Sequence, residues 1–131
     1  MVLVDTSVWI RFLADRPPFA RELDRLLVLD DVAGHELVYG ELLIGDRGGR
    51  KKLLVDYERM PQAQTIPHLE VVAFVRARKL HGRGVGWIDT HLLASAIVER
   101  IHVWTADPRF AALAQELGVA YHIPGHSGIQ R

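Results

Sequence analysis

The chain alternates short runs of β-branched and aliphatic residues with longer stretches whose apolar residues recur at helical spacing. Such alternation is typical of a parallel sheet covered by helices on both faces, because each crossover between parallel strands carries a helix. Strands are predicted at residues 2–4, 31–33, 63–66, 101–105 and 119–122. Helices are predicted at residues 7–14, 20–29, 35–44, 49–59, 68–81, 88–100 and 108–117. The sequence therefore predicts an α/β protein.

Length and composition indicate one domain. The chain has 131 residues, of which 49% are hydrophobic, and this is enough to form a core. The segment from Pro124 to Arg131 has little apolar surface to bury. We therefore predict one domain over residues 1–123 and a flexible C-terminal tail over residues 124–131.

Charge and cysteine content limit the partners and the compartment. The 16 Lys and Arg residues balance 16 Asp and Glu residues, so any contact with a nucleic acid must use local basic patches. The absence of cysteine excludes disulfides and thiolate metal sites, and it suits a reducing compartment. There is no apolar stretch of about 18 residues, and Asp5 interrupts the apolar run at the start. We expect a cytoplasmic protein without a membrane partner.

Four acidic residues lie where predicted strands end or on predicted helices. Asp5 ends the first strand and Asp107 follows the fourth, so both fall at the carboxyl edge of the sheet. Right-handed crossovers would place these two strands side by side, and ligands of open α/β sheets bind at that edge. Glu41 lies in the helix at residues 35–44, and Asp89 lies in the first turn of the helix at residues 88–100. These positions predict one site assembled from four distant segments.

Each acid also has a purely structural explanation. Asp107 precedes Pro108, a combination typical of a helix N-terminus, and Asp5 or a hydroxyl residue after it could cap the next helix. Asp89 would complement the dipole of its helix, and Glu41 could face solvent. Helix capping is therefore the simpler interpretation of any one acid taken alone.

Helical spacing separates the two interpretations. Asp89 shares a helix face with the apolar residues Leu92, Leu93 and Ala96. Glu41 has mostly apolar neighbours in its helix, so we expect it to be half-buried. Carboxylates that point inward need a counter-charge, and few basic residues lie in these segments. Oxygen ligands without cysteine favour Mg²⁺ or Mn²⁺ over Zn²⁺.

Two basic clusters are candidate nucleic-acid surfaces. They consist of Arg47, Arg50, Lys51 and Lys52, and of Arg76, Arg78, Lys79 and Arg83. Such clusters are most often solvated helix faces. If the acids form a nuclease site, one or both clusters become candidate RNA-binding surfaces, because phosphate contacts dominate affinity for nucleic acids.

Four sequence motifs surround the acids and carry a resemblance. They are Val-Asp-Thr-Ser-Val-Trp-Ile, Tyr-Gly-Glu-Leu-Leu-Ile-Gly, Gly-Arg-Gly-Val-Gly-Trp-Ile-Asp-Thr-His-Leu-Leu-Ala and Val-Trp-Thr-Ala-Asp-Pro-Arg-Phe. In this order the chain resembles the PIN-domain ribonucleases, most closely VapC-type toxins of bacterial toxin–antitoxin modules. The resemblance spans Met1 to about Ile123. It implies a three-layer α/β/α sandwich with a parallel five-stranded sheet of order 3-2-1-4-5.

The resemblance also implies a site and its chemistry. It assigns metal binding and catalysis to Asp5, Glu41, Asp89 and Asp107, the acids that position alone selects. It gives a supporting or water-holding role to Thr6, Ser7 and Thr105. The residues and the resemblance together predict a Mg²⁺-dependent endoribonuclease, with Mn²⁺ as an alternative ion, that hydrolyses RNA with metal-activated water.

Partners follow from the resemblance as well. A VapC-type toxin is expected to be neutralised by a cognate antitoxin protein and to form a homodimer. We predict that the apolar helix around Trp9, Phe12 and Leu13 supplies a hydrophobic groove for these contacts.

Two other functions remain open on the sequence alone. A structure-specific DNA nuclease of the wider PIN-like group would use the same acids, but such enzymes usually have longer chains. A non-catalytic PIN-fold binding module would be expected to have lost an acid, whereas all four are present.

Overall fold

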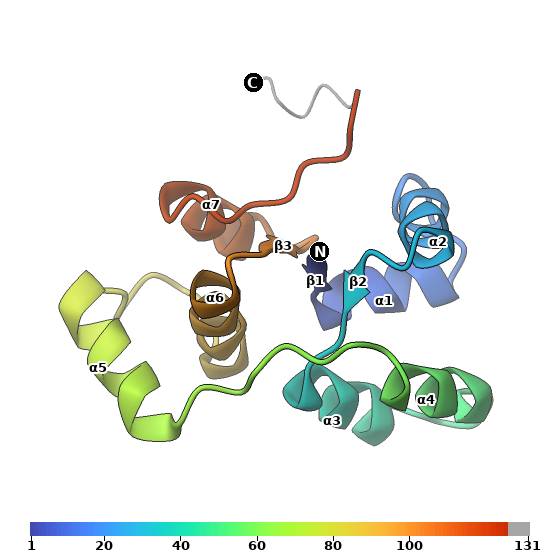
Figure 1. Ribbon diagram of the computed structural model, residues 1–131, viewed down its shortest axis with the longest axis horizontal. Coiled ribbons are helices and arrows are strands. Elements are labelled where there is room, and N and C mark those ends of the chain that lie inside the picture. Colours follow the sequence, from blue (N-terminus) through green and yellow to red (C-terminus); the bar gives the residue numbers. More distant parts are fainter. Residues whose placement is uncertain (126–131) are drawn as a thin grey trace.

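The computed structural model describes residues 1–125, which form three short strands and seven helices (Figure 1). Residues 126–131, most of the predicted flexible tail, lie outside the described residues. The strands are β1 (Val2–Val4), β2 (Val32–Ala33) and β3 (His102–Trp104). The helices are α1 (Thr6–Leu13), α2 (Phe19–Val28), α3 (Glu36–Ile44), α4 (Lys51–Glu58), α5 (His68–Arg78), α6 (Trp87–Glu99) and α7 (Pro108–Glu116).

The strands form one parallel sheet of order β2-β1-β3. Val2 of β1 pairs with Val32 on one side and with His102 on the other. The predicted placement of the first strand at the centre, beside the fourth predicted strand, is therefore confirmed. This arrangement brings the carboxyl ends of β1 and β3 together.

The two outer strands of the predicted five-stranded sheet are not formed. Each is reduced to an isolated bridge, Gly34 with Gln62 beside β2 and Val103 with Ala120 beside β3. The segment at residues 63–66 lies between two prolines, which lack the backbone N–H that a ladder requires. In addition, the carbonyl of Gln64 accepts a hydrogen bond from Ser95 of α6 at 2.6 Å. The observed sheet within residues 1–125 thus has three strands instead of five, and their order agrees with the central part of the predicted order 3-2-1-4-5.

All seven predicted helices are present, and their starts agree to within two residues. The largest difference is at the end of α5, which stops at Arg78, whereas the prediction extended it to residue 81. Lys79 adopts a left-handed conformation with φ of 54° and ends the helix there.

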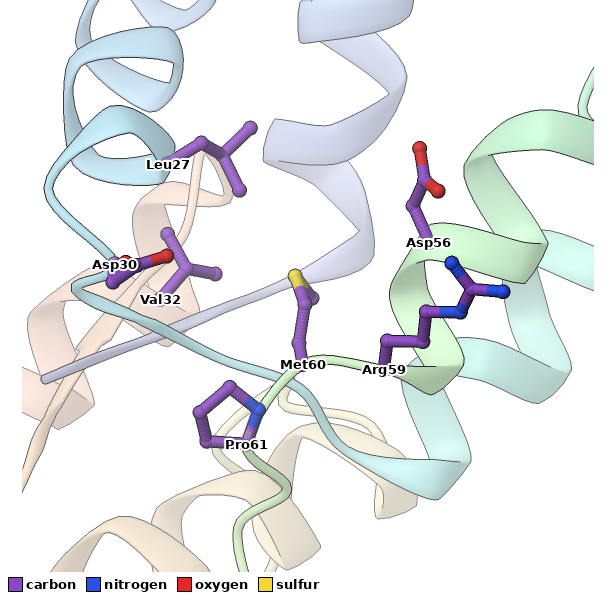
Figure 2. A pocket seen from close by; sticks show the side chains of 7 residues that line it. All are labelled: Leu27, Asp30, Val32, Asp56, Arg59, Met60 and Pro61. Carbon is purple, nitrogen blue, oxygen red and sulfur yellow. The ribbon is translucent and has the colours of Figure 1, made fainter.

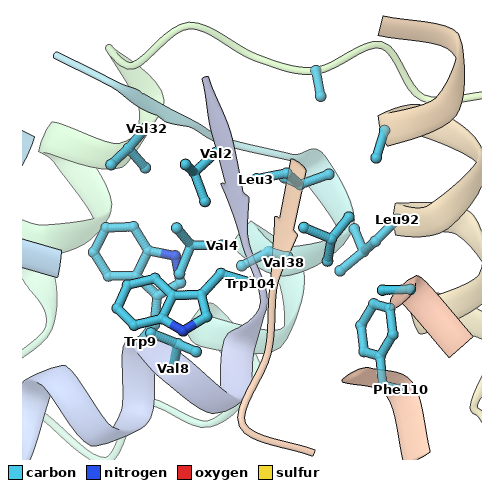
Figure 3. Close-up of a cluster of buried hydrophobic side chains, with 14 of the residues drawn as sticks. Val2, Leu3, Val4, Val8, Trp9, Val32, Val38, Leu92, Trp104 and Phe110 are labelled. Carbon is cyan, nitrogen blue, oxygen red and sulfur yellow. The ribbon is translucent and has the colours of Figure 1, made fainter. Parts of the chain in front are cut away.

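The core lies on both faces of β1, whose three residues are buried. Alternate side chains of a strand point to opposite faces. Figure 3 shows Val2 and Val4 on the side of Trp9 from α1, and Leu3 on the side of Leu92 from α6. Helices therefore cover both faces of the central strand, as the alternating sequence pattern predicts.

Candidate active site

Asp5 and Asp107 follow the carboxyl ends of neighbouring strands. Asp5 comes directly after β1, and its backbone N–H donates to the carbonyl of Trp104 in β3 at 2.9 Å. Its side chain is buried, with 5% of the residue exposed. Asp107 lies three residues after β3 and begins α7. The two acids therefore occupy the sheet edge at which α/β proteins bind ligands.

Two hydroxyl groups connect Asp5 to the segment that carries Asp107. The carboxylate oxygen Oδ2 of Asp5 accepts hydrogen bonds from Ser7 Oγ at 2.6 Å and from Thr105 Oγ1 at 2.8 Å. Thr105 Oγ1 in turn accepts the backbone N–H of Asp107 at 3.0 Å, and Ser7 Oγ accepts that of Ala106 at 3.0 Å. These contacts fix the rotamer of Asp5 and hold the two strand ends together.

Glu41 and Asp89 reach the same region from helices α3 and α6. Glu41 is half-buried, as predicted, and its Oε1 accepts a hydrogen bond from Thr6 Oγ1 at 2.6 Å. Asp89 is also half-buried, and its Oδ2 accepts the backbone N–H of Gly86 at 3.4 Å. The apolar residues on the helix face of Asp89, which are Leu92, Leu93 and Ala96, are fully buried.

The charges of the other three acids act on Asp89. Burial raises the pKa of the Asp89 carboxyl to about 6, and the negative charge of Asp5 adds to this rise. The charges of Asp107 and Glu41 act in the same direction, whereas the Gly86 N–H opposes them. None of the ion pairs found within residues 1–125 includes any of the four acids. We call these four residues the acid cluster.

The capping interpretation is right for Asp107 and wrong for Asp5. Oδ1 of Asp107 accepts the backbone N–H groups of Arg109 at 2.8 Å and Phe110 at 3.4 Å, with Pro108 at the first helical position. Asp5 precedes α1 but makes no side-chain capping bond, because its carboxylate is used by the two hydroxyls. Asp107 therefore has a structural task and still belongs to the acid cluster.

The carboxylates leave oxygens available for a cation. The described residues donate to only one oxygen of each acid, which leaves Asp5 Oδ1, Glu41 Oε2, Asp89 Oδ1 and Asp107 Oδ2 without a protein donor. In their present rotamers, no three acidic or histidine side chains within residues 1–125 are close enough to hold an ion together. The available donors are all carboxylate oxygens, and their negative charge has no basic partner among the described residues. Such a set of donors fits Mg²⁺ or Mn²⁺.

The comparisons with known proteins agree with this geometry. A family model described as PIN domain matches residues 2–116. The chain belongs to the PIN domain family. It is 43% identical over 122 residues to Ribonuclease VapC32 of Mycobacterium tuberculosis in two strains, over 92% of this chain and 95% of each relative. The predicted membership among VapC-type PIN proteins is thereby confirmed.

A solved structure supports the same fold. The crystal structure of FitAcB from Neisseria gonorrhoeae superposes with a TM-score of 0.64 at 26% sequence identity. The match covers 96% of this chain and 99% of that chain. This PIN domain thus has a counterpart of nearly the same extent.

The predicted RNA-binding residues of the PIN domain fall into two groups. Three already have partners: Arg50 donates to a backbone carbonyl of α3, Lys52 pairs with Asp56, and Arg83 pairs with Glu116. The other five predicted residues, Arg47, Lys51, Arg76, Arg78 and Lys79, are exposed and belong to none of the ion pairs found within residues 1–125. These five side chains remain candidates for RNA binding, two of them between α3 and α4 or at the start of α4 and three near the end of α5.

A second polar cluster, which no sequence motif indicates, connects α3 to α6. His35 precedes α3 and is completely buried; its Nδ1 accepts the backbone N–H of Leu37 at 3.1 Å. Because Nδ1 accepts, the proton of the neutral ring is on Nε2, which lies 3.0 Å from Ser95 Oγ. Ser95 then donates to the carbonyl of Gln64. The hydroxyl of Tyr57 accepts the His35 backbone N–H at 2.8 Å.

We call His35, Tyr57, Gln64 and Ser95 the His35 network. Burial lowers the pKa of His35 to about 4; the charge of Glu36 opposes this effect and that of His91 adds to it. The network joins the start of the Glu41 helix to the Asp89 helix. Histidine is not among the preferred N-cap residues, so no sequence signal points to this role.

A pocket of about 170 Å³ lies away from the acid cluster (Figure 2). Its lining residues are Leu27, Asp30, Val32, Asp56, Arg59, Met60 and Pro61. Val32 is the first residue of β2, so the pocket adjoins the amino end of that strand, whereas Asp5 and Asp107 follow the carboxyl ends of strands. None of the four acids lines the pocket, and we assign it no part in the site.

The predicted protein-binding groove needs a correction on α1. Trp9 is only 1% exposed and packs edge-on against Phe12 and Tyr57, so it belongs to the core. The exposed apolar residues of α1 are Ile10 and Leu13.

No helix within residues 1–125 has both the length and the apolar character needed to cross a membrane.

Proposed function

We propose that this PIN domain protein is a Mg²⁺- or Mn²⁺-dependent endoribonuclease and the toxin of a toxin–antitoxin module. The observation that carries the proposal is the acid cluster: four carboxylates from four segments, with the pKa of Asp89 raised by burial and by the other three. The relatives named Ribonuclease VapC32 support RNA as the substrate.

The cation would be held by Asp5, Asp89 and Asp107, with Glu41 bound directly or through a water. When bound, such an ion lowers the pKa of water and neutralises charge on the phosphate oxygens. Rotations of the carboxylates would be needed to bring their free oxygens together. A cation in this place also removes the repulsion among the acids.

The protein's own contribution is to position the carboxylates. Ser7 and Thr105 hold one oxygen of Asp5, and Thr6 holds one oxygen of Glu41, so the second oxygen of each faces a defined direction. Asp107 is fixed by the first turn of α7. This preorganisation is what electrostatic catalysis requires, because groups already in place cost no reorganisation during the reaction.

The first test is metal dependence. Purified protein is expected to cleave single-stranded RNA with Mg²⁺ or Mn²⁺ and to lose activity in excess EDTA. Addition of Mg²⁺ without RNA should raise the Tm of the wild-type protein, because the ion binds only the folded state. Asp5→Asn should lack this rise, whereas Asp24→Asn, an exposed acid on α2, should keep it. Cleavage that survives chelation would contradict the metal-dependent mechanism.

The second test is the chemistry of the product ends. Attack by water with the 3′ oxygen as leaving group yields a 5′-phosphate and a 3′-hydroxyl. Attack by the ribose 2′-hydroxyl yields a 2′,3′-cyclic phosphate and needs a base such as histidine near the ribose. We expect 5′-phosphate fragments that can be ligated directly. Products dominated by cyclic phosphate ends would overturn the hydrolytic mechanism even with the family assignment intact.

Substrate choice separates the proposal from its alternatives. Cleavage of structured DNA in preference to RNA would favour a structure-specific DNA nuclease. RNA binding without cleavage under any divalent ion would favour a binding module. Sequencing the RNA fragments after brief expression would identify the target.

The proposal includes an antitoxin and a homodimer as partners. Exposed aliphatic side chains lie on α1, at Ile10 and Leu13, and on α3, at Leu43 and Ile44, the last being 88% exposed. Light scattering should show a dimer, and coexpression of the neighbouring small gene product should suppress toxicity. Ile44→Asp should weaken either dimer formation or antitoxin binding, whereas Val98→Asp, at an exposed position of α6, should weaken neither. A monomer that no neighbouring protein neutralises would contradict the toxin assignment.

A further inference from the structure

Trp87 differs from the other two tryptophans of the chain. Trp9 and Trp104 are 1% and 4% exposed and belong to the core, whereas Trp87 is 41% exposed at the start of α6. Its indole therefore contributes less to core packing and presents an aromatic surface to solvent. A large aromatic side chain that is packed on one side and exposed to solvent on the other is a common element of binding sites.

The ring of Trp87 is held in place by two histidines. The His68 ring of α5 lies 5.3 Å from it, with an angle of 59° between the planes. The His91 ring lies 5.1 Å away and nearly perpendicular, at 89°. His91 is only 6% exposed, and its Nδ1 is buried without a hydrogen-bond partner within residues 1–125. An aromatic ring fixed in this way loses little conformational entropy when a second ring stacks on it.

Trp87 also lies in the same helical turn as Asp89. It is the first residue of α6, and Asp89 follows two residues later, about 3 Å along the helix axis and about 200° around it, so the two side chains leave the amino end of α6 on opposite sides. The backbone N–H of Gly86, the residue before Trp87, donates to the Asp89 carboxylate. An RNA strand that crosses the amino end of α6 would therefore pass both side chains, with a phosphate at Asp89 and a neighbouring nucleotide at Trp87.

We propose that Trp87 is a stacking platform for a nucleobase of the single-stranded RNA substrate, next to the phosphate that the acid cluster receives. The proposal rests on the ribonuclease function proposed above. Single-stranded RNA is recognised by stacking of unpaired bases on aromatic side chains, and the base edge is read by nearby hydrogen-bonding groups. The exposed imidazole of His68 is such a group.

A nucleobase fits these observations better than an apolar protein segment. Of the two imidazole rings that contact Trp87, that of His68 is exposed and can hydrogen-bond to a base, whereas the buried ring of His91 supports the indole from below. The exposed aliphatic residues assigned above to protein contacts lie on other helices, α1 and α3. The platform would act on substrate affinity and on the choice of the base beside the cleaved bond.

The test uses the intrinsic fluorescence of the full chain with EDTA present, so that RNA is bound without being cleaved. Because the other two tryptophans are buried, quenching by a short oligoadenylate should report on Trp87 alone. Trp87→Phe should abolish the quenching while keeping most of the affinity for a labelled oligoadenylate. Trp87→Leu, which keeps apolar volume but has no aromatic face, should weaken that affinity roughly 10- to 100-fold.

Controls separate the possible failures. Val98→Leu, at an exposed position of the same helix, should bind oligoadenylate like the wild type, and the Tm of each variant verifies folding. With Mg²⁺, Trp87→Leu should raise KM more than it lowers kcat. If the wild type cleaves RNA but Trp87→Leu binds and cleaves it unchanged, the platform is rejected and the ribonuclease proposal stands. If Trp87→Leu alters only self-association or antitoxin binding, the ring belongs to a protein interface. If the wild type neither binds nor cleaves RNA, both proposals fail.

Discussion

The acid cluster and the His35 network are both polar groups set into apolar surroundings, but only the network is internally satisfied. In the network, each nitrogen of the His35 ring has a hydrogen-bond partner, and the ring is neutral. In the acid cluster, the charges of Asp5, Asp107 and Glu41 all act on Asp89, and none of the four carboxylates has a basic partner within residues 1–125. The difference separates a cluster that stabilises the fold from one that is kept for a ligand.

The two clusters are mechanically connected. α3 begins directly after His35 and carries Glu41, while α6 carries both Asp89 and Ser95. A satisfied hydrogen-bond network between these helices holds in place the carboxylates that repel one another. The His35 network therefore supports the acid cluster. Substitutions in the acid cluster should mainly lower activity, whereas substitutions in the His35 network should mainly lower stability.

The largest expected effect is the loss of RNA cleavage when an acid of the cluster is substituted. Asp5→Asn, Asp89→Asn and Asp107→Asn should each lower RNA cleavage roughly 100-fold or more, because each removes a charge that positions the cation. At least one of them, with Asp89→Asn the best candidate, should leave the Tm of the metal-free protein unchanged or raised, because repulsion is relieved.

Glu99→Gln is the matched control for these three variants. Glu99 is exposed near the end of α6, and its substitution should change neither activity nor Tm. Clear destabilisation of all three metal-free acid variants would favour helix capping as the reason for these residues.

The next largest expected effect is the contribution of His35 to the pH dependence of the unfolding free energy. The folded-state pKa of about 4 lies below the ordinary value of 6.5, so the unfolded state takes up the proton first. The stabilising contribution of the neutral ring is full above pH 6.5 and is lost as the pH falls toward 4. His35→Asn keeps an N-cap side chain but cannot titrate. The unfolding free energy of the wild type relative to this variant should therefore fall by about 3 kcal/mol between pH 7 and pH 4.

Urea denaturation of both proteins across this pH range provides the measurement. Glu36 and His91 are present in both proteins, so their charges largely cancel in the difference. A difference in unfolding free energy that does not change with pH would show that His35 is protonated as easily in the folded protein as in the unfolded chain.

The smallest effect distinguishes the two tasks of Asp107. Asp107→Asn keeps an oxygen that can accept the Arg109 N–H, whereas Asp107→Ala does not. Both variants should lose RNA cleavage. Only the alanine variant should lose unfolding free energy, by about 1 kcal/mol, as measured by chemical denaturation of the metal-free proteins. Equal stability of the two variants would mean that the cap contributes nothing.

Much of this PIN domain follows from sequence pattern. The helices follow from apolar spacing and from turn residues, and the start of α7 follows from Asp107 and Pro108. The acids follow from their place at strand ends and on apolar helix faces. The loss of the two outer strands could not be predicted from the pattern. It depends on competition for backbone groups between residues far apart in the chain, such as the hydrogen bond from Ser95 to the Gln64 carbonyl.

The sequence by itself determined the order of helices, the parallel arrangement of the central strands and the four carboxylates, because these depend on local periodicity and on residue type. The tertiary structure decided which groups are charged, paired or exposed. Three features depend on distances between segments: the raised pKa of Asp89, the neutral buried ring of His35, and the exposure of Trp87 where the other two tryptophans are buried. Solvation and charge interactions are set by such distances, and a linear pattern of residues does not contain them.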